Sequence, residues 1–183
     1  MIFKANFKKN YNFGKIKLEK LNFKHIQDLN EYSQIKSFYE FIEYPPFKSK
    51  KETESYFKGK IKQNDFKKNF WWSIIYKKNN KAVGTFVFHD YNNKRHTIEG
   101  SWGLSPNYQG EGIMKTVVSN MIKIANRNKI ARIQQIADVN NVPTVKLTMS
   151  LGFRIEGIMK NYCFYQRNKK YSDAYLLSYT KKK

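Results

Sequence analysis

The sequence predicts a single α/β (α+β) domain in which helices flank a mixed, mostly antiparallel central sheet. Its 183 residues suit one domain with one core. Three β-rich runs follow one another through short turns rich in Asn and Lys, the pattern of an antiparallel meander: 70–76, 82–89 and 97–104. Residues 113–125 then place apolar side chains at helical spacing from Ile113 to Ile124, which predicts a helix with one face in the core.

The segments before the meander predict one strand and three helices. Residues 15–21 alternate as a strand does, with Ile16 and Leu18 on one face. Three helices are expected next, at 23–33, at 35–42 and from Ser49 to about Lys68. The second of them must end before the Tyr44-Pro45-Pro46 run, because the residue before a proline avoids the helical conformation.

The segments after the central helix complete the sheet. We expect a strand at 130–137, a helix at 143–151 with Asn140 or Asn141 near its cap, and two last strands at 153–165 and 171–179. No repeat or linker divides the chain. Residues 1–183 are therefore expected to form one domain, with its core over about 15–178 and a loose basic tail at 181–183.

The composition favours a folded protein and limits its chemistry. It is 40% hydrophobic and 16% aromatic, which is typical of a chain that folds. With one Cys and three scattered His residues, we expect no disulfide and no metal site. No apolar run reaches the ~20 residues of a membrane span. Lys4, Lys8 and Lys9 interrupt any signal-peptide core, so we expect a cytoplasmic protein without membrane contact.

The net charge of +21 has two explanations. The lysines spread along the whole chain together with Asn, Ile, Phe and Tyr, a mixture that an A/T-rich coding sequence produces. Alternatively the charge serves a partner rich in phosphate or carboxylate, such as coenzyme A, an acidic protein, a nucleotide or the ribosome. No nucleic-acid-binding motif is visible, so direct nucleic-acid binding is disfavoured. Monomer and homodimer both stay open.

A glycine-rich loop opens the central helix. The strand ending at Leu104 is followed by a Pro-containing turn and then by Gln109-Gly110-Glu111-Gly112. The first amide N–H groups of a helix have no intrahelical partners, and the helix dipole adds partial positive charge there. The two glycines let an anion approach the backbone without meeting a Cβ atom. The loop therefore predicts a diphosphate site, with an ordinary glycine turn as the alternative.

A second motif lies about thirty residues further on. Asn141-Val142-Pro143-Thr144 starts a helix, Leu151-Gly152-Phe153 ends it, and Tyr171 to Leu176 forms the tail. Together with the Gln-Gly-x-Gly loop and in this order, these segments resemble the GNAT superfamily of N-acetyltransferases, and within it the RimJ/RimL type that acetylates ribosomal-protein N-termini. The resemblance covers roughly Lys15 to Ser178. It implies the GNAT fold and dependence on acetyl-CoA.

The resemblance also implies the cofactor contacts. The N–H groups of the loop would bind the diphosphate: Gln109, Gly110, Glu111, Gly112, Ile113 and Met114. Relatives usually have Gly or Ala in place of Met114, but only its N–H needs to reach phosphate. The strand end Trp102-Gly103-Leu104 would hold the pantetheine arm and donate an N–H to the thioester oxygen, a contact worth ~2.7–4 kcal/mol. Asn141 and Thr144 complete the expected cofactor contacts.

Acetyl transfer also needs a base for the amine and a proton for the departing thiolate. Many relatives have a Tyr where this chain has Thr148, whereas RimL-like members use a Ser where this chain has Thr144. Thr144 is therefore the candidate proton donor, with a plain helix cap as the alternative. Glu99 is the candidate base, with a strand residue paired to a Lys as the alternative. Where RimL-like relatives often have a second Glu, this chain has Cys163, which we interpret as a small buried hydrophobe.

The acceptor is predicted from amine chemistry and from aromatic residues. An α-amine with a pKa near ~7.8 is partly neutral at pH 7, whereas a lysine at ~10.4 needs about 3–4 kcal/mol more for deprotonation. One good carboxylate therefore suits an α-amine. Since Trp71 and Trp72 point to opposite faces of a strand, only one of them can be core if the other face is open. Aromatic residues that either stack on a planar acceptor group or belong to the core are Tyr44, Phe47, Trp72, Phe86 and Trp102.

The sequence therefore predicts an acetyl-CoA-dependent N-acetyltransferase that works by direct attack in a ternary complex. The default acceptor is a protein N-terminus of the ribosomal type. The first alternative is a self-immunity or detoxification enzyme that acetylates the α-amine of an aminoacyl-nucleotide antibiotic of the microcin C type. The second is a non-catalytic GNAT module that binds RNA or an acidic partner.

Overall fold

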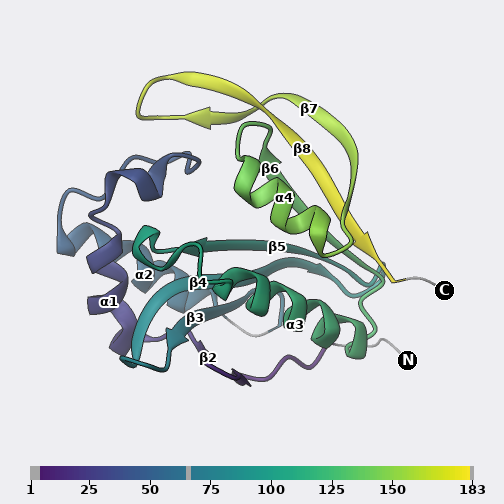
Figure 1. The fold of residues 1–183 in the computed structure, drawn as a ribbon, viewed down its shortest axis with the longest axis horizontal. Coiled ribbons are helices and arrows are strands. Elements are labelled where there is room, and N and C mark those ends of the chain that lie inside the picture. Colours follow the sequence, from purple (N-terminus) through teal and green to yellow (C-terminus); the bar gives the residue numbers. More distant parts are fainter. Residues whose placement is uncertain (1–4, 65–66, 182–183) are drawn as a thin grey trace.

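One twisted sheet runs through the molecule (Figure 1). The structure is a computed structural model that describes residues 5–64 and 67–181. Within these residues eight strands lie in the order β1-β2-β3-β4-β5-β6-β8-β7. Their bounds are Asn10–Phe13 (β1), Ile16–Lys20 (β2), Phe70–Tyr76 (β3), Lys81–Asn92 (β4), Thr97–Leu104 (β5), Arg132–Asp138 (β6), Arg154–Tyr165 (β7) and Lys170–Thr180 (β8). All neighbours pair antiparallel except β5 and β6, which confirms the mixed, mostly antiparallel sheet.

Helices cover both faces of the sheet. They are α1 (Ile26–Tyr32), α2 (Lys50–Gln63), α3 (Ile113–Arg127) and α4 (Val142–Ser150), with short 3₁₀ turns at Phe23–His25, Lys36–Tyr39 and Pro106–Tyr108. The apolar face of α3 packs on the larger core cluster, with Trp72, Phe86 and Ile98 from the sheet. Helices α1 and α2 pack on the opposite face in a second cluster that includes Trp71. The two adjacent tryptophans therefore point to opposite faces, as predicted.

Several predicted elements differ from the structure. Strand β1 was not predicted, because its four residues are too short for a clear alternation. The segment 35–42 forms only the 3₁₀ turn Lys36–Tyr39. The third helix ends at Gln63 rather than near Lys68, because the Asn64 side chain both donates to and accepts from the backbone of Trp71, at 3.0 Å each. Residues 65–66, within the expected end of this helix, and residues 182–183 of the expected tail lie outside the described residues.

The sheet opens between β5 and β6. These strands pair in parallel only from Thr97↔Arg132 to Glu99↔Gln134, although β5 continues to Leu104 and β6 to Asp138. Beyond Glu99 and Gln134 the two strands diverge, and α4 follows β6 on one side of the gap (Figure 1). Strand β6 pairs with β8 along its whole length, so the opening affects only its β5 side. A wedge is thus built into the middle of the sheet.

Across the described part of the chain, no helix combines the length and the apolar character that a membrane crossing requires.

Candidate functional site

A cleft of about 480 Å³ lies at this wedge. Four segments form it: the end of β5, the glycine-rich loop with the start of α3, the start of α4, and the segment 37–42. All but one of the expected cofactor residues line it, namely Trp102, Gly103, Leu104, Gln109, Gly110, Gly112, Ile113, Met114, Asn141 and Thr144. The structure thus brings together two motifs that are thirty residues apart in the sequence.

The glycine-rich loop presents backbone to the cleft. Gly110 and Gly112 have φ angles of 80° and 70°, a left-handed conformation that a side chain disfavours. A Cβ atom added at either glycine would meet nothing within 4 Å, so the space beside them is open. Gly112 precedes α3 without a side-chain cap, and no acidic residue lies in the first turn. The first N–H groups of a 15-residue helix and the Lys115 side chain therefore favour an anion in this cleft.

Glu111 is the expected cofactor residue that does not line the cleft. Lys15 Nζ donates to its carbonyl oxygen at 3.0 Å and lies 3.9 Å from its carboxylate. Burial and the Glu111 carboxylate raise the pKa of Tyr76, which places the acidic side chain beside β3. Glu111 therefore contributes only its backbone to the loop, and its negative charge is directed away from the anion position.

Asn141 is the cap of α4. Its side-chain oxygen accepts a hydrogen bond from the N–H of Thr144 at 3.3 Å, and Asn140 instead donates from its backbone to Asp138. Thr144 is thus the third residue of the helix rather than its cap, and its side chain lines the cleft. The helix-cap interpretation of Thr144 is therefore wrong, and the role of proton donor stays a prediction.

Two residues at family positions have no access to the cleft. The Thr148 side chain is fully buried, with its hydroxyl oxygen 2.6 Å from the Gln135 side-chain oxygen. Cys163 is buried beside Ala174, and burial raises the pKa of its thiol to about 11. Such a thiol stays protonated at neutral pH and cannot act as a base. This agrees with Cys163 as a small buried hydrophobe.

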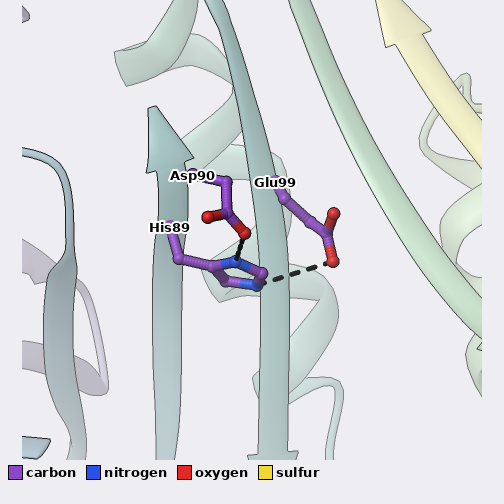
Figure 2. Close-up of side chains that lie close together, drawn as sticks. All are labelled: His89, Asp90 and Glu99. Carbon is purple, nitrogen blue, oxygen red and sulfur yellow. Dashed lines mark hydrogen bonds and ion pairs between the residues drawn. The ribbon is translucent and has the colours of Figure 1, made fainter. Parts of the chain in front are cut away.

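Glu99 lies at the point where β5 and β6 separate. Its side chain is 15% exposed. One carboxylate oxygen accepts from the Gln134 side-chain nitrogen at 2.9 Å, and the other lies 3.6 Å from His89 Nε2 (Figure 2). These contacts, rather than a lysine, hold Glu99 in place. Glu99, Ser101 and Gly103 share one face of β5, toward the segment 37–42, because alternate residues of a strand point to the same side.

The aromatic expectations are wrong at two positions. Trp72 and Phe86 are 0% and 1% exposed in the core under α3, so neither can contact an acceptor. Tyr44 and Phe47 stack on each other and pack with Tyr56, outside the lining of the cleft. Trp102 alone of these five lines the cleft, where it stacks on Phe86 at 6.0 Å. Packing in the core thus explains Trp72 and Phe86, whereas contact of Tyr44, Phe47 and Trp102 with an acceptor stays a prediction.

The segment 37–42 covers one side of the cleft, and sequence reasoning missed it. Arg167 donates from its guanidinium to the carbonyl oxygens of Tyr39 and Glu40. Glu43 accepts from the N–H of Phe164 at 2.8 Å and of Gln166 at 2.9 Å. Figure 1 shows this segment beside the tip of the β7–β8 hairpin. Since these contacts join positions over 120 residues apart, no local pattern could have predicted them.

Comparisons with known proteins agree with the geometry. The family described as "Acetyltransferase (GNAT) domain" matches residues 15–154. The L-amino acid N-acetyltransferase AaaT of Escherichia coli is 28% identical over 89 residues, which are 48% of this chain and 54% of AaaT. The match spans about half the length of each curated relative.

Two solved structures share the fold. The microcin self-immunity acetyltransferase MccE, in complex with acetyl-CoA and AMP, has a TM-score of 0.83 at 20% identity, over 92% of this chain and 93% of that one. The ribosomal-protein alpha-N-acetyltransferase RimL, in complex with coenzyme A, has a TM-score of 0.83 at 20% identity, over 93% and 97%.

Proposed function

Because this chain belongs to the acetyltransferase (GNAT) domain family, we propose that it transfers the acetyl group of acetyl-CoA to a primary α-amine. The proposed default acceptor is the N-terminus of a protein, of the ribosomal type. The reaction is a direct attack of the amine on the thioester while both substrates are bound. No metal ion takes part in the proposed reaction.

One observation carries this proposal. The uncapped start of α3 meets the glycine-rich loop at the cleft, where open space adjoins two left-handed glycines. The diphosphate of acetyl-CoA fits that place, since helix N-termini bind phosphate through their free N–H groups. The pantetheine arm would then follow the end of β5 into the wedge, past Trp102 and Gly103.

The neighbouring residues supply the rest of the chemistry. A backbone N–H of the β5 end would stabilise the thioester oxygen as it becomes negative, which is worth ~2.7–4 kcal/mol. Glu99, on the face of β5 turned toward the segment 37–42, would accept a proton from the amine. Thr144, which lines the cleft at the start of α4, would donate a proton to the departing thiolate. Each residue lies on a regular element, which fixes its direction.

The choice of an α-amine rests on proton affinity. An α-amine requires about 3–4 kcal/mol less for deprotonation than a lysine at pH 7, and Cys163 cannot supply a second base. Two similar proteins are named for such acceptors: AaaT for L-amino acids and RimL for a protein N-terminus.

A second candidate is an aminoacyl-nucleotide acceptor, as in self-immunity. The MccE structure holds AMP, and the Trp102 ring in the cleft offers a surface on which a base can stack. A non-catalytic module is the weaker alternative, because such a module would not need an open anion site at α3.

The test is release of coenzyme A from acetyl-CoA with a panel of acceptors. The panel holds N-terminal peptides, aminoacyl-nucleotides, amino sugars and polyamines. Its matched control is the same peptide with a blocked N-terminus and a free lysine side chain. We expect thiol release and a mass increase of one acetyl group with the free N-terminus and little with the blocked one. Faster reaction of an aminoacyl-nucleotide would favour the second candidate. Binding of acetyl-CoA without transfer to any acceptor would contradict catalysis.

A further inference from the structure

We propose that His89 and Asp90 form a proton exit from the acceptor side of the cleft, with Ser101 and Glu99 at its inner end. This inference rests on the proposed function and adds the residues that remove the proton of the acceptor ammonium. The juxtaposition comes from the end of β4 and the middle of β5, where His89 is the cross-strand partner of Glu99. Sequence reasoning did not single out His89, Asp90 or Ser101.

The hydrogen bonds fix the form of the imidazole. His89 Nδ1 lies 2.6 Å from Asp90 Oδ2, and Nε2 lies 2.8 Å from Ser101 Oγ (Figure 2 shows the contact with Asp90). An ionised carboxylate can only accept, so Nδ1 must carry the hydrogen when the ring is neutral. Nε2 is then an acceptor, and the Ser101 hydroxyl donates to it. The basic nitrogen of His89 thus faces β5.

A second acceptor converges on the same place. Glu99 Oε1 lies 3.6 Å from His89 Nε2. A carboxylate and a lone pair repel each other unless a proton donor or a positive charge lies at or between them. Either a protonated His89 or a donor such as an ammonium N–H satisfies both groups. The cluster is therefore suited to bind a protonated amine and to accept its proton.

Exposure increases along the cluster. The side chain of Glu99 is 15% exposed, that of His89 is 25% exposed and that of Asp90 is 78% exposed. Asp90 has a φ angle of 51°, a left-handed conformation that Asp adopts more readily than most residues. The outer end of the cluster is thus in water, whereas the inner end is largely covered. A proton that reaches Nε2 can leave at the Nδ1 side without crossing the cleft.

The inner end lies close to the proposed thioester position. Ser101 and Gly103 are two residues apart on one face of β5, a separation of about 7 Å. Gly103 lines the cleft, and a Cβ atom placed there would lie 3.2 Å from the Phe38 ring. Glu99 is also the last residue of β5 that pairs with β6 before the wedge opens. His89, Glu99 and Ser101 lie outside the lining of the cleft, so the attacking amine is placed between them and Gly103, on this face of β5.

The proton balance is simple. The bound ammonium gives one proton to Nε2 of His89, directly or through the Ser101 hydroxyl, which donates one proton as it receives another. The resulting imidazolium is paired with Asp90 and faces Glu99. It loses its Nδ1 proton to water beside Asp90, and proton exchange with water restores the Nδ1–H form before the next turnover. The neutral amine attacks the thioester carbon and the C–S bond breaks; Glu99 takes the second amine proton, and Thr144 donates a proton to the departing sulfur and recovers one from Glu99. The products are the N-acetyl compound and coenzyme A.

The charged groups around His89 support this sequence of proton transfers. Asp90 on β4 and Glu99 on β5 face its two nitrogens. From β7, Tyr162 lies close enough that burial and the charges of Glu99, Glu43 and Asp90 raise its pKa, so it stays a neutral phenol. The surroundings are thus acidic in a chain of net charge +21. They favour a cationic acceptor.

The test compares pH profiles of kcat/KM for His89→Gln, Asp90→Asn and Ser101→Ala with the wild type. We expect His89→Gln to lose about tenfold or more at pH 6.5, where an α-amine is mostly protonated, and to approach the wild-type value near pH 9. Asp90→Asn should lose less of kcat/KM, with the same dependence on pH. His96→Asn, outside the cluster, should follow the wild type. Melting temperature and affinity for coenzyme A show whether each variant is folded.

A second measurement does not depend on the acceptor. Nitrogen NMR of the three histidines, assigned with His89→Gln, should show neutral His89 with its hydrogen on Nδ1. A hydrogen on Nε2 of neutral His89 would overturn the proposed proton exit. If the wild-type protein acetylates an amine but kcat/KM of His89→Gln is lower by the same factor at every pH, the proton exit is overturned and the proposed function stands. A wild-type protein that acetylates no amine would overturn the proposed function and the proton exit with it.

Discussion

Replacing Gly112 by Asp should weaken the binding of coenzyme A about 30-fold through its added charge. Gly112 lines the cleft, with a φ angle of 70° and an open space at its Cβ position, so a new side chain there has room beside the proposed diphosphate position. A carboxylate there would lie about 5 Å from a phosphate charge, which gives about 3 kcal/mol of repulsion at an effective dielectric constant of 20. Screening at physiological salt reduces this to about 2 kcal/mol, or roughly 30-fold in Kd.

The matched control is Gly112→Asn, which has the same shape and the same tolerance for a positive φ angle but no charge. Titration calorimetry with coenzyme A should therefore give a Kd for Asp at least ~30-fold weaker than for Asn, and the difference should narrow in 1 M salt. Gly152→Asp, at another left-handed glycine beyond the far end of α4, should bind nearly as the wild type does. Equal Kd values for Gly112→Asp and Gly112→Asn would refute the assignment of the anion site.

Three further changes test other parts of the site and fold. Thr144→Val should slow acetyl transfer at least ~10-fold with an unchanged Kd for coenzyme A, because the side chain lines the cleft without capping α4; an unchanged rate would exclude it as proton donor. Cys163, whose thiol pKa is raised to about 11, should resist alkylation at pH 8 in the native protein, since about 0.1% is thiolate; rapid labelling seen by mass spectrometry would show an exposed thiol. Burial raises the pKa of Glu19, but hydrogen bonds from Lys17, Lys24 and His25 lower it further, to about 2. Because folding lowers the pKa of this carboxyl, Glu19 stabilises the folded protein at pH values above its unfolded pKa, and this contribution is lost as the pH falls from about 4.5 toward 2. In urea unfolding at pH 7, the free energy of unfolding of the wild type should exceed that of Glu19→Gln by up to about 3 kcal/mol. The difference should shrink as the pH is lowered through that range.

The cofactor side of the site could be predicted because its determinants are local. A left-handed glycine, a helix start and an asparagine cap each depend on a few neighbouring residues, and all three lie where the Gln-Gly-x-Gly and Asn-x-x-Thr motifs indicate. The strands and helices around them follow from periodicity for the same reason. The direction of Glu111 was not predictable, because it depends on Lys15 in a separate turn.

The acceptor side was largely missed because its determinants are non-local. The proposed role of His89 depends on its cross-strand pair with Glu99 and on Ser101, which alternation alone does not specify. The segment 37–42 is held by Arg167 and Glu43 across most of the chain length. Trp72 and Phe86 carry the same chemical signal whether they line a cleft or fill a core, and only burial separates the two cases. Tyr44 and Phe47 are half-buried and pack on Tyr56.

The proposed cofactor side and the proposed acceptor side of the site adjoin where the pairing of β5 with β6 ends, at Glu99 and Gln134. A strand that loses its neighbour exposes backbone N–H and C=O groups, which an extended arm such as pantetheine can satisfy. The same break leaves the Glu99 side chain bound to Gln134 on one side and facing His89 on the other. Because the proposed thioester slot and the proposed proton acceptors start from the same pair, a shift of one residue in this register would move both and turn Glu99 to the opposite face of the sheet. The register of β5 against β6 would therefore set the distance between the proposed cofactor position and the proposed base.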